Sequence, residues 1–244
     1  MAPNIRDILR SLVPDLLLDG VRGAILACEA RRLSRLANGK TEPVALVDAV
    51  WRFGRFRPLQ RRIEIVRFLE LVRGIRPAAV LEIGAASGGT TFLLSRVASP
   101  DSIVISIDLG FTQGRVRAVH SWAAPGQTLV CLARDSHRRE TFQEVARLLG
   151  GRPLDLLFID GDHSYAGVAS DFSMFSPLVR SGGLIGFHDI IPDYKARFGI
   201  ETVNWTGGVP EFWSQVRDRY PHEEIVENPD QDGYGLGVLR WVAI

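Results

Sequence analysis

Aspartate and histidine residues in the second half of the chain stand where side chains can take part in chemistry. Asp160 ends the apolar run Leu154–Ile159, and His163 follows three residues later. His188 and Asp189 directly follow a second apolar run. A histidine titrates near neutral pH and can accept a proton from a hydroxyl group, while carboxylates can orient it or bind a cation. The pattern predicts a catalytic centre built from these four residues.

A glycine-rich segment forms a second candidate site. Gly84 follows an apolar run and permits a tight turn, and Gly88 or Gly89 would let the backbone approach a ligand closely. Asp108 ends the next apolar run, where a carboxylate can hold a ribose diol. Ala86 stands where a dinucleotide-binding turn needs its second glycine, which argues against NAD. For the turn alone, a strand-to-helix connection without a ligand stays the alternative.

The elements that must position these residues are visible as short apolar runs alternating with helix-like segments after residue 78. This alternation predicts an α/β fold with a Rossmann-like, doubly wound, mostly parallel seven-stranded sheet covered by helices on both faces. The last two runs have no helix between them and predict an antiparallel edge. The expected strands are Ala78–Ile83, Ser102–Ile107, Thr128–Leu132, Leu154–Ile159, Gly183–Phe187, Glu223–Glu227 and Tyr234–Val242, and the expected helices between them are Thr90–Val97, Arg139–Leu149 and Val168–Val179.

The first 75 residues predict helices instead. We therefore divide the chain into a helical extension, residues 1–75, and a ligand-binding domain, residues 76–244. The apolar face of the third helix is expected to carry Ile63, Val66, Leu69 and Val72. These helices are candidates for completing the pocket or for a homo-oligomer interface. The expected helices are Ile5–Leu36, broken near Pro14 and Gly20, then Val44–Phe53 and Leu59–Val72.

The composition of the chain narrows the class of protein. Its 244 residues are 46% hydrophobic and 23% charged, with a formal net charge of +1. A nucleic-acid or membrane-surface partner would favour a clear basic excess, so neither partner is expected. Acidic residues interrupt the N-terminal apolar runs, which argues against a signal peptide. Cys28 and Cys131 are expected to be buried free thiols, which fits a reducing, cytoplasmic location.

The glycine segment resembles a known family. Glu82-x-Gly84-x-x-x-Gly88 is similar to the first motif of class I S-adenosylmethionine-dependent methyltransferases, and Asp108 matches their ribose-binding acid. The resemblance implies that S-adenosylmethionine is the cofactor, that Glu82 supports its methionine end, and that the segment around Asp135 faces adenine. The cofactor contacts implied are Glu82, Gly84, Ala85, Ser87, Gly88, Asp108, Leu109, Asp135, Ser136, His137 and Asp160.

The second half of the chain resembles a narrower group. The run Phe158–Tyr165 and the later Phe187–Asp189 are similar to a bacterial group that includes macrolide-sugar O-methyltransferases and cephalosporin-hydroxylase-like proteins. The similarity extends from about Leu59 to Arg240. It implies that His163 is the general base and that Asp160 assists it. The acceptor implied is a hydroxyl of a small molecule, most simply a sugar of a glycosylated natural product or glycan.

The same resemblance implies a divalent metal, with magnesium as the first choice. The corresponding ligand positions are Asp160, His188 and Asp189. His188 departs from the oxygen ligands that magnesium prefers. Three alternatives stay open: the two aspartates hold the metal with water and substrate oxygens, a softer ion such as manganese is used, or the site is free of metal.

Two other functions remain alternatives. One is methylation of a catechol or other phenol, whose lower pKa would reduce the need for a base. The other is a non-catalytic, S-adenosylmethionine-binding partner subunit. The aromatic-rich segment 190–214 is expected to form a lid or substrate wall, whereas Phe212 and Trp213 within it are expected to pack in the core.

Overall fold

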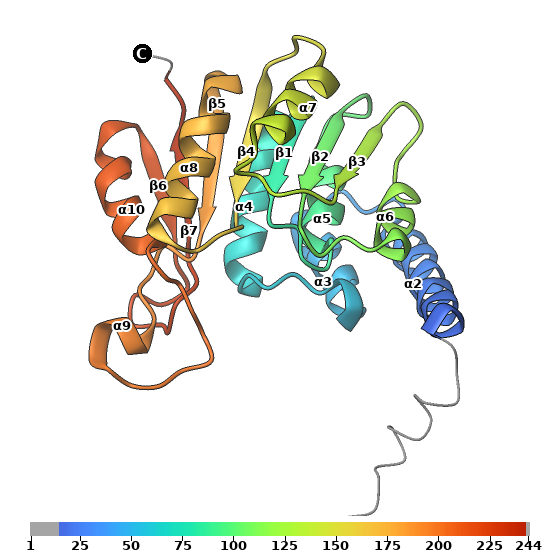
Figure 1. Ribbon diagram of the computed structural model, residues 1–244, viewed down its shortest axis with the longest axis horizontal. Helices are drawn as coiled ribbons and strands as arrows, with labels where there is room; N and C mark the ends of the chain where they lie inside the picture. Colours follow the sequence, from blue (N-terminus) through green and yellow to red (C-terminus); the bar gives the residue numbers. More distant parts are fainter. Residues whose placement is uncertain (1–14, 243–244) are drawn as a thin grey trace, which may run out of the picture.

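The structure is a computed structural model that describes residues 15–242. Its seven strands form one sheet in the order β3-β2-β1-β4-β5-β7-β6, shown in Figure 1. The first five strands along the chain are parallel, and β7 runs antiparallel to both β5 and β6. The predicted Rossmann-like sheet with an antiparallel edge is therefore confirmed. The strands are β1 (Ala79–Ile83), β2 (Ile103–Ile107), β3 (Thr128–Leu132), β4 (Leu154–Ile159), β5 (Val179–His188), β6 (His222–Ile225) and β7 (Leu236–Arg240).

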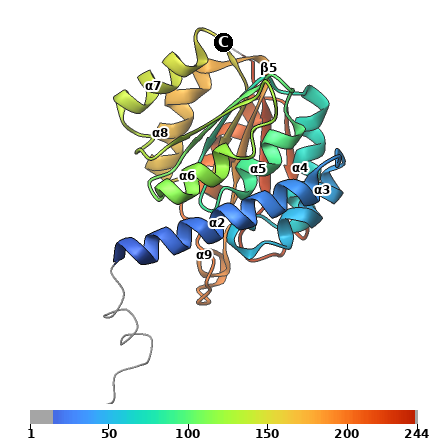
Figure 2. The same ribbon diagram turned by 90° about the vertical axis from the view of Figure 1, so that its right-hand side faces the viewer.

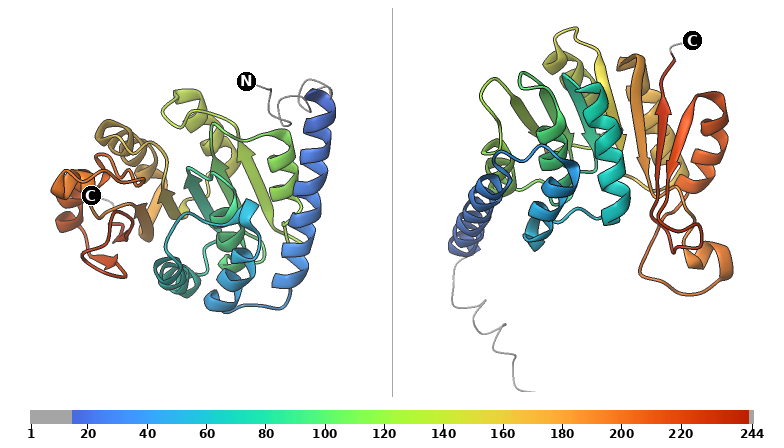
Figure 3. Two further views of the ribbon diagram at one scale, coloured as in Figure 1. Left: turned by 90° about the horizontal axis from the view of Figure 1, so that it is seen from below. Right: turned by 180° about the vertical axis from the view of Figure 1, so that it is seen from behind.

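Helices cover both faces of the sheet. The view from behind in Figure 3 shows α2, α3, α4 and α5 on one face, while α7, α8 and α10 lie on the other. Helix α9 lies beyond the carboxyl ends of the strands (Figure 1). The α-helices are α2 (Asp15–Ala37), α3 (Pro43–Trp51), α4 (Arg62–Ile75), α5 (Gly89–Val97), α6 (Gln113–His120), α7 (Arg139–Leu149), α8 (Tyr165–Phe175), α9 (Tyr194–Phe198) and α10 (Val209–Val216), and the 3-10 helices are η1 (Gly54–Phe56), η2 (Ser176–Leu178) and η3 (Arg217–Arg219).

Each face of the sheet has its own apolar core. On one face the Trp122 ring meets Phe56 and Phe92 edge-on, with centroids 4.9 and 5.1 Å apart. On the other face Phe187 packs against Phe212 and Trp213. The last two side chains are buried, as predicted. Nonpolar burial on both faces is what a mostly parallel sheet requires.

The N-terminal helices share the first of these cores. Helix α2 passes along α6, as Figure 2 shows, and contributes Leu33, while α3 contributes Leu46 and α4 contributes Leu69. The predicted break at Gly20 is wrong, because α2 runs through it without interruption. The predicted break at Pro14 lies outside the described residues. No helix among the described residues combines the length and the apolar character needed to cross a membrane.

Two burial predictions in this region are also wrong. Ile63 lies in the first turn of α4 and is 47% exposed, whereas Ile65 and Phe68 are buried. Val66, Leu69 and Val72 are buried as predicted, so only Ile63 departs from the predicted apolar face. Cys28 is exposed and Cys131 is half-buried, so the two free thiols do not form the buried pair that was expected.

Several element ends differ from prediction for local reasons. Helix α8 begins at Tyr165, before the predicted Val168, because the Ser164 side chain accepts a hydrogen bond from the Gly167 amide at 3.0 Å. It ends before Ser176 and Pro177, so β5 begins at Val179 rather than Gly183. Strand β7 begins at Leu236 rather than Tyr234, since φ values of 62° at Tyr234 and 84° at Gly235 are incompatible with a strand. Strand β6 lies one to two residues earlier than predicted, and helix α6 was not among the predicted helices.

Candidate functional site

A cavity of about 800 Å³ lies at the carboxyl ends of the parallel strands. This is the edge at which open α/β sheets bind ligands. Every strand from β1 to β5 supplies the cavity with residues at or just beyond its end. The lining residues are Leu59, Gly84, Ala86, Ile107, Asp108, Leu109, Arg134, Asp135, Ser136, His137, Asp160, Gly161, Asp162, His163, His188, Asp189, Val203, Asn204, Trp205 and Tyr234.

The glycine turn is shaped by protein packing. Gly84 has a φ of +87°, and a Cβ placed on it would overlap the carbonyl oxygen of Asp160. A Cβ on Gly89 would overlap the Phe56 carbonyl oxygen, and one on Gly88 would crowd Val119. These glycines let the turn approach other parts of the protein. That Gly88 or Gly89 also lets the backbone approach a ligand stays a prediction.

Asp108 ties the end of β2 to this turn. Its Oδ2 accepts a hydrogen bond from the Ala86 amide at 2.7 Å, and its Oδ1 accepts one from the Gly110 amide at 2.6 Å. Leu109 beside it is exposed and forms part of the cavity rim. The carboxylate therefore stands at the cavity wall, where a ribose-binding acid is expected.

Glu82 lies beneath the turn. Its carboxylate is fully buried and accepts hydrogen bonds from Thr91 and, at 2.7 Å, from the Ser106 hydroxyl. Burial raises the pKa of Glu82 to about 7. Glu82 is not among the lining residues, and neither are Ala85, Ser87 and Gly88. Glu82 is thus placed to support the turn from below.

The segment predicted to face adenine does line the cavity. Asp135 accepts a hydrogen bond from the His137 amide at 2.9 Å, which shapes the loop after β3. The Nε2 atom of His137 lies 3.4 Å from Oδ1 of Asp171, a fully buried residue of α8. Burial raises the pKa of Asp171 to about 6. Ser136 and His137 are therefore held by the protein as well as exposed to the cavity.

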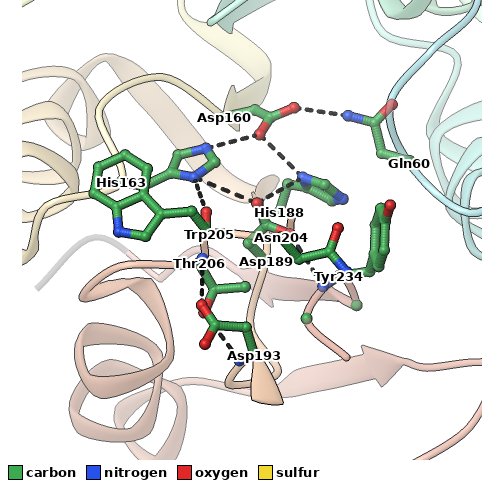
Figure 4. Close-up of polar contacts among 12 residues, drawn as sticks. Gln60, Asp160, His163, His188, Asp189, Asp193, Asn204, Trp205, Thr206 and Tyr234 are labelled. Atoms are coloured by element: carbon green, nitrogen blue, oxygen red, sulfur yellow. Dashed lines mark hydrogen bonds and ion pairs between the residues drawn. The ribbon is translucent and has the colours of Figure 1, made fainter. Parts of the chain in front are cut away.

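The predicted catalytic residues converge, as Figure 4 shows. Oδ1 of Asp160 lies 3.0 Å from Nδ1 of His188 and 3.5 Å from Nε2 of His163. Oδ2 of Asp160 accepts a hydrogen bond from Nε2 of Gln60 at 2.7 Å. Oδ2 of Asp189 lies 3.4 Å from Nδ1 of His163 and 3.4 Å from Nδ1 of His188. The four residues form one polar cluster, which Gln60 joins.

The aspartates and histidines of this cluster shift one another's pKa values. The hydrogen bond to Asp160 raises the pKa of His163 to about 9, against the opposing effect of partial burial. Burial disfavours the charged form of His188, but Asp160 and Asp189 outweigh it and raise the pKa of His188 well above its ordinary value. Burial also opposes ionisation of Asp160, yet the two histidines hold its pKa below the ordinary value. Without ligands, the cluster therefore holds paired positive and negative charges.

The cluster also fits a divalent cation, although not with the ligand set predicted. One potential ligand atom each from Asp160, His163 and Asp189 lies within 4.8 Å of the others. Two carboxylates and an imidazole suit manganese or a softer ion better than magnesium. His188 stands outside this group, with its Nδ1 atom directed at the Asp160 carboxylate. The two aspartates belong to this group as predicted, and its third member is His163.

Backbone strain is concentrated at this cavity. Among the described residues, four that are not glycine have a positive φ, and three of them line the cavity: Ala86 at 43°, Asp189 at 64° and Tyr234 at 62°. The Tyr234 amide donates a hydrogen bond to Oδ1 of Asp189 at 3.1 Å, so two of the strained residues hold each other. Such conformations cost free energy and persist where the surrounding structure enforces them, often at functional sites.

The segment after β5 forms one wall of the cavity. Val203, Asn204 and Trp205 line it, and the Trp205 ring stacks on the His163 ring with centroids 5.6 Å apart. Asp193 anchors the segment by accepting hydrogen bonds from the Thr206 amide at 3.0 Å and the Ala196 amide at 2.8 Å. The segment therefore has the place of the predicted lid or substrate wall.

Comparisons with known proteins agree with this geometry. Residues 81–190 match the model of a family described as a methyltransferase domain. Uncharacterized protein y4gI of Sinorhizobium fredii is 27% identical over 179 residues, which are 70% of this chain and 18% of that protein. This chain thus spans less than a fifth of that relative's length.

Solved structures share the fold. The O-methyltransferase TomG of Streptomyces achromogenes, solved with S-adenosylmethionine, has a TM-score of 0.53 and 17% identity, covering 85% of this chain and 94% of that one. The MycE methyltransferase of the mycinamycin pathway was solved with magnesium, S-adenosylhomocysteine and mycinamycin VI. It has a TM-score of 0.54 and 17% identity, covering 82% of this chain and 55% of that one. The residues that match the methyltransferase-domain model run from β1 to just beyond β5 of the doubly wound sheet, and they include most of the residues that line the cavity at its carboxyl edge.

Proposed function

We propose that the chain is an O-methyltransferase that moves the methyl group of S-adenosylmethionine to a hydroxyl of a small molecule. The observation that carries the proposal is the convergence of His163, Asp160 and Asp189 in the same cavity as Asp108, the predicted ribose-binding acid. A hydroxyl group keeps its proton at neutral pH, so its attack on the methyl carbon needs a base. His163 is the base that this cavity offers.

The orientation of His163 defines which nitrogen acts. Nδ1 lies 2.9 Å from the carbonyl oxygen of Trp205, which only accepts, so a neutral ring keeps its hydrogen on Nδ1. Nε2 then takes the proton of the acceptor hydroxyl. The acceptor oxygen forms a bond to the methyl carbon as the carbon–sulfur bond breaks, and the sulfur keeps the electron pair. The products are the methyl ether and S-adenosylhomocysteine.

The charge of the cofactor favours this step. In the absence of ligands, Asp160 keeps His163 largely protonated. A sulfonium entering a cavity lined by five aspartates and one arginine is attracted to it. Its positive charge also disfavours the protonated form of a nearby histidine. Cofactor binding therefore shifts His163 towards the neutral form that the reaction needs.

Asp160 and Asp189 are the residues that would hold a divalent cation, with His163 adjacent. When bound, such a cation stabilises negative charge on the acceptor oxygen. His163 cannot use one nitrogen both to bind a metal and to accept a proton. We therefore assign His163 to proton transfer and the two aspartates to any cation.

We propose a sugar hydroxyl as the acceptor. The support comes from the resemblance of the run Phe158–Tyr165 to macrolide-sugar O-methyltransferases and from the likeness in fold to MycE, which was solved with mycinamycin VI. The exposed Trp205 beside His163 offers a ring face on which a sugar can stack.

Calorimetry with S-adenosylmethionine and S-adenosylhomocysteine, followed by methyl-transfer assays on sugar and phenol acceptors, tests the proposal. His163→Ala should keep cofactor binding and lose about 10²–10⁴ in kcat. His120→Ala is the matched control, because His120 is exposed at the end of α6 and does not line the cavity. The proposal would be contradicted if neither S-adenosylmethionine nor S-adenosylhomocysteine binds, or if His163→Ala keeps full activity.

A further inference from the structure

A second recess of about 520 Å³ adjoins the cavity described above. Leu59 and Tyr234 line both spaces, so the two lie side by side. The recess is formed mainly by the connection between α3 and α4, with Trp51 at the end of α3. None of the predicted cofactor-binding, catalytic or metal-binding residues lines it.

The recess lies on the acceptor side of the site. Asp108 and Asp135 follow β2 and β3, whereas Asp160 and Asp189 follow β4 and β5 on the other side of β1. Gln60 lines the recess and donates a hydrogen bond to Oδ2 of Asp160 at 2.7 Å. The wall of the recess is thus one hydrogen bond away from Asp160. It also contacts the glycine turn, because the Arg57 carbonyl oxygen accepts a hydrogen bond from the Ser87 hydroxyl at 3.1 Å.

The recess and the cavity carry opposite charges. Three arginines and one acid line the recess, whereas the cavity is lined by five aspartates against one arginine and the protonated His163 and His188, and so stays negative. Arg61 pairs with Glu227 at 2.9 Å, and Arg62 pairs with Asp48 at 2.6 Å. The Arg57 guanidinium has no carboxylate partner among the described residues and lies 5.3 Å from the Trp51 ring centroid. Arg57 is therefore the cation in the recess that is available to a ligand.

We propose that this recess binds an anionic group of the acceptor, a carboxylate or a phosphate, with Arg57 as its main ligand. Guanidinium groups bind both anions through paired hydrogen bonds. The rings of Trp51 and Tyr234 flank the recess and offer apolar faces to the rest of the acceptor. The positively charged cofactor and the negatively charged acceptor are then drawn to opposite ends of one site. This inference rests on the proposed methyl transfer, since it assigns the acceptor's charge.

Small aromatic probes test the recess without knowledge of the natural acceptor. Benzoate and phenyl phosphate, with neutral benzamide as reference, are titrated by calorimetry into the full chain saturated with S-adenosylhomocysteine. At least one anion should bind about tenfold or more tightly than benzamide, as a charge-assisted hydrogen bond allows. Comparison of the two anions distinguishes a carboxylate from a phosphate acceptor.

Arg57→Gln should abolish the preference for the anion. Arg67→Gln is the matched control, because Arg67 is an exposed arginine of α4 that pairs with Glu223 and does not line the recess. Equal binding of anions and benzamide by the unaltered chain, or equal losses in both variants, would overturn the inference. Saturation with S-adenosylhomocysteine is measured first, so failure of the cofactor site is distinguished from failure of the recess.

The same variant gives a kinetic readout. Glucose, glucuronate and glucose 6-phosphate form one acceptor series, and catechol and protocatechuate form another. In any series that is methylated, Arg57→Gln should raise KM for the anionic member about tenfold or more and leave the neutral member unchanged. A parallel fall in kcat for both members would instead show that Arg57 acts on the reaction centre, which contradicts the assignment.

Discussion

Nδ1 of His163 lies 2.9 Å from the carbonyl oxygen of Trp205, while Nε2 of the same ring lies 3.5 Å from Oδ1 of Asp160. One nitrogen is thereby committed to the wall formed after β5, and the other faces the reaction centre. The wall segment therefore does more than enclose the cavity. In a neutral ring the Trp205 carbonyl oxygen favours the hydrogen on Nδ1, which is the tautomer that the proposed base role of His163 requires.

The pH dependence of catalysis follows from this pair. Asp160 raises the pKa of His163 to about 9, and the base must be unprotonated. In the unaltered chain kcat/KM should therefore rise with pH towards 9, because this ratio reports the ionisation of the free enzyme. In kcat, which reports the cofactor-bound state, the rise should occur at lower pH. Profiles measured between pH 6 and 10 check both points, and a rise of the same shape in His163→Ala would contradict them.

Glu82 should make stability fall as pH rises. Burial raises its pKa to about 7 in the folded chain from 4.5, so the folded state binds more protons between these values. The free energy of unfolding therefore decreases from pH 4.5 to 7 and stays reduced above it. Glu82→Gln should gain roughly 1–3 kcal/mol at pH 8 and little at pH 4.5. Urea unfolding at the two pH values measures this.

Glu64 provides the control for that experiment. It is equally buried, but its carboxylate accepts hydrogen bonds from the amides of Glu227 and Gly235 and from the Gln231 side chain. Glu64→Gln should destabilise the chain at both pH values, because buried partners lose an acceptor. A stability gain in Glu64→Gln equal to that in Glu82→Gln would show that the pKa of Glu82 is not the cause.

Gly84 should tolerate no side chain. A Cβ there would overlap the Asp160 carbonyl oxygen, and the φ of +87° is unfavourable for alanine. Gly84→Ala should therefore cost about 2 kcal/mol or more and lower the melting temperature. Gly74→Ala is the opposite case: it lies in α4 with open space around it and should stabilise by about 0.5–1 kcal/mol. Equal melting temperatures for both variants would contradict the packing argument.

The affinity for metal should depend on His188. Its Nδ1 atom lies 3.0 Å from Oδ1 of Asp160 and competes with a cation for that oxygen. His188→Asp should bind magnesium more tightly, since it removes this competitor and adds an oxygen ligand. His188→Asn adds an oxygen ligand without adding a negative charge, so comparison with His188→Asp separates the two effects. Calorimetry with magnesium and manganese measures the change, and unchanged affinity in both variants would show that His188 does not compete for the site.

Removal of metal gives a complementary test of mechanism. With His163 as the base, a chelator should lower the rate and leave its rise with pH in place, because proton transfer stays with the histidine. Loss of the pH dependence together with the metal would instead identify a metal-bound group as the source of that ionisation.

The sequence was informative where one physical rule decides the outcome. Asp160 and Asp189 could be placed together because parallel strands end at the same sheet edge. Gln60 and Tyr234 were missed, since both lie in irregular segments that only tertiary packing brings to Asp160 and Asp189. Trp205 lies in the aromatic-rich segment predicted to form a lid or substrate wall, but no periodicity could show that its carbonyl oxygen meets His163. Ser164, a serine at the N-cap position, is the sequence signal that could have predicted the start of α8 at Tyr165.

The connection between α3 and α4 has a consequence for how this protein can evolve. Three residues of this connection lie within five positions and have three different contacts. Phe56 packs in the core, Arg57 lines the recess, and Gln60 donates a hydrogen bond to Asp160. Selection for a new acceptor must therefore alter a segment that also supports the glycine turn through the Phe56 backbone. Substitutions that change acceptor specificity are therefore expected to lower the free energy of unfolding. Variants that start with a higher free energy of unfolding should acquire new acceptors most readily.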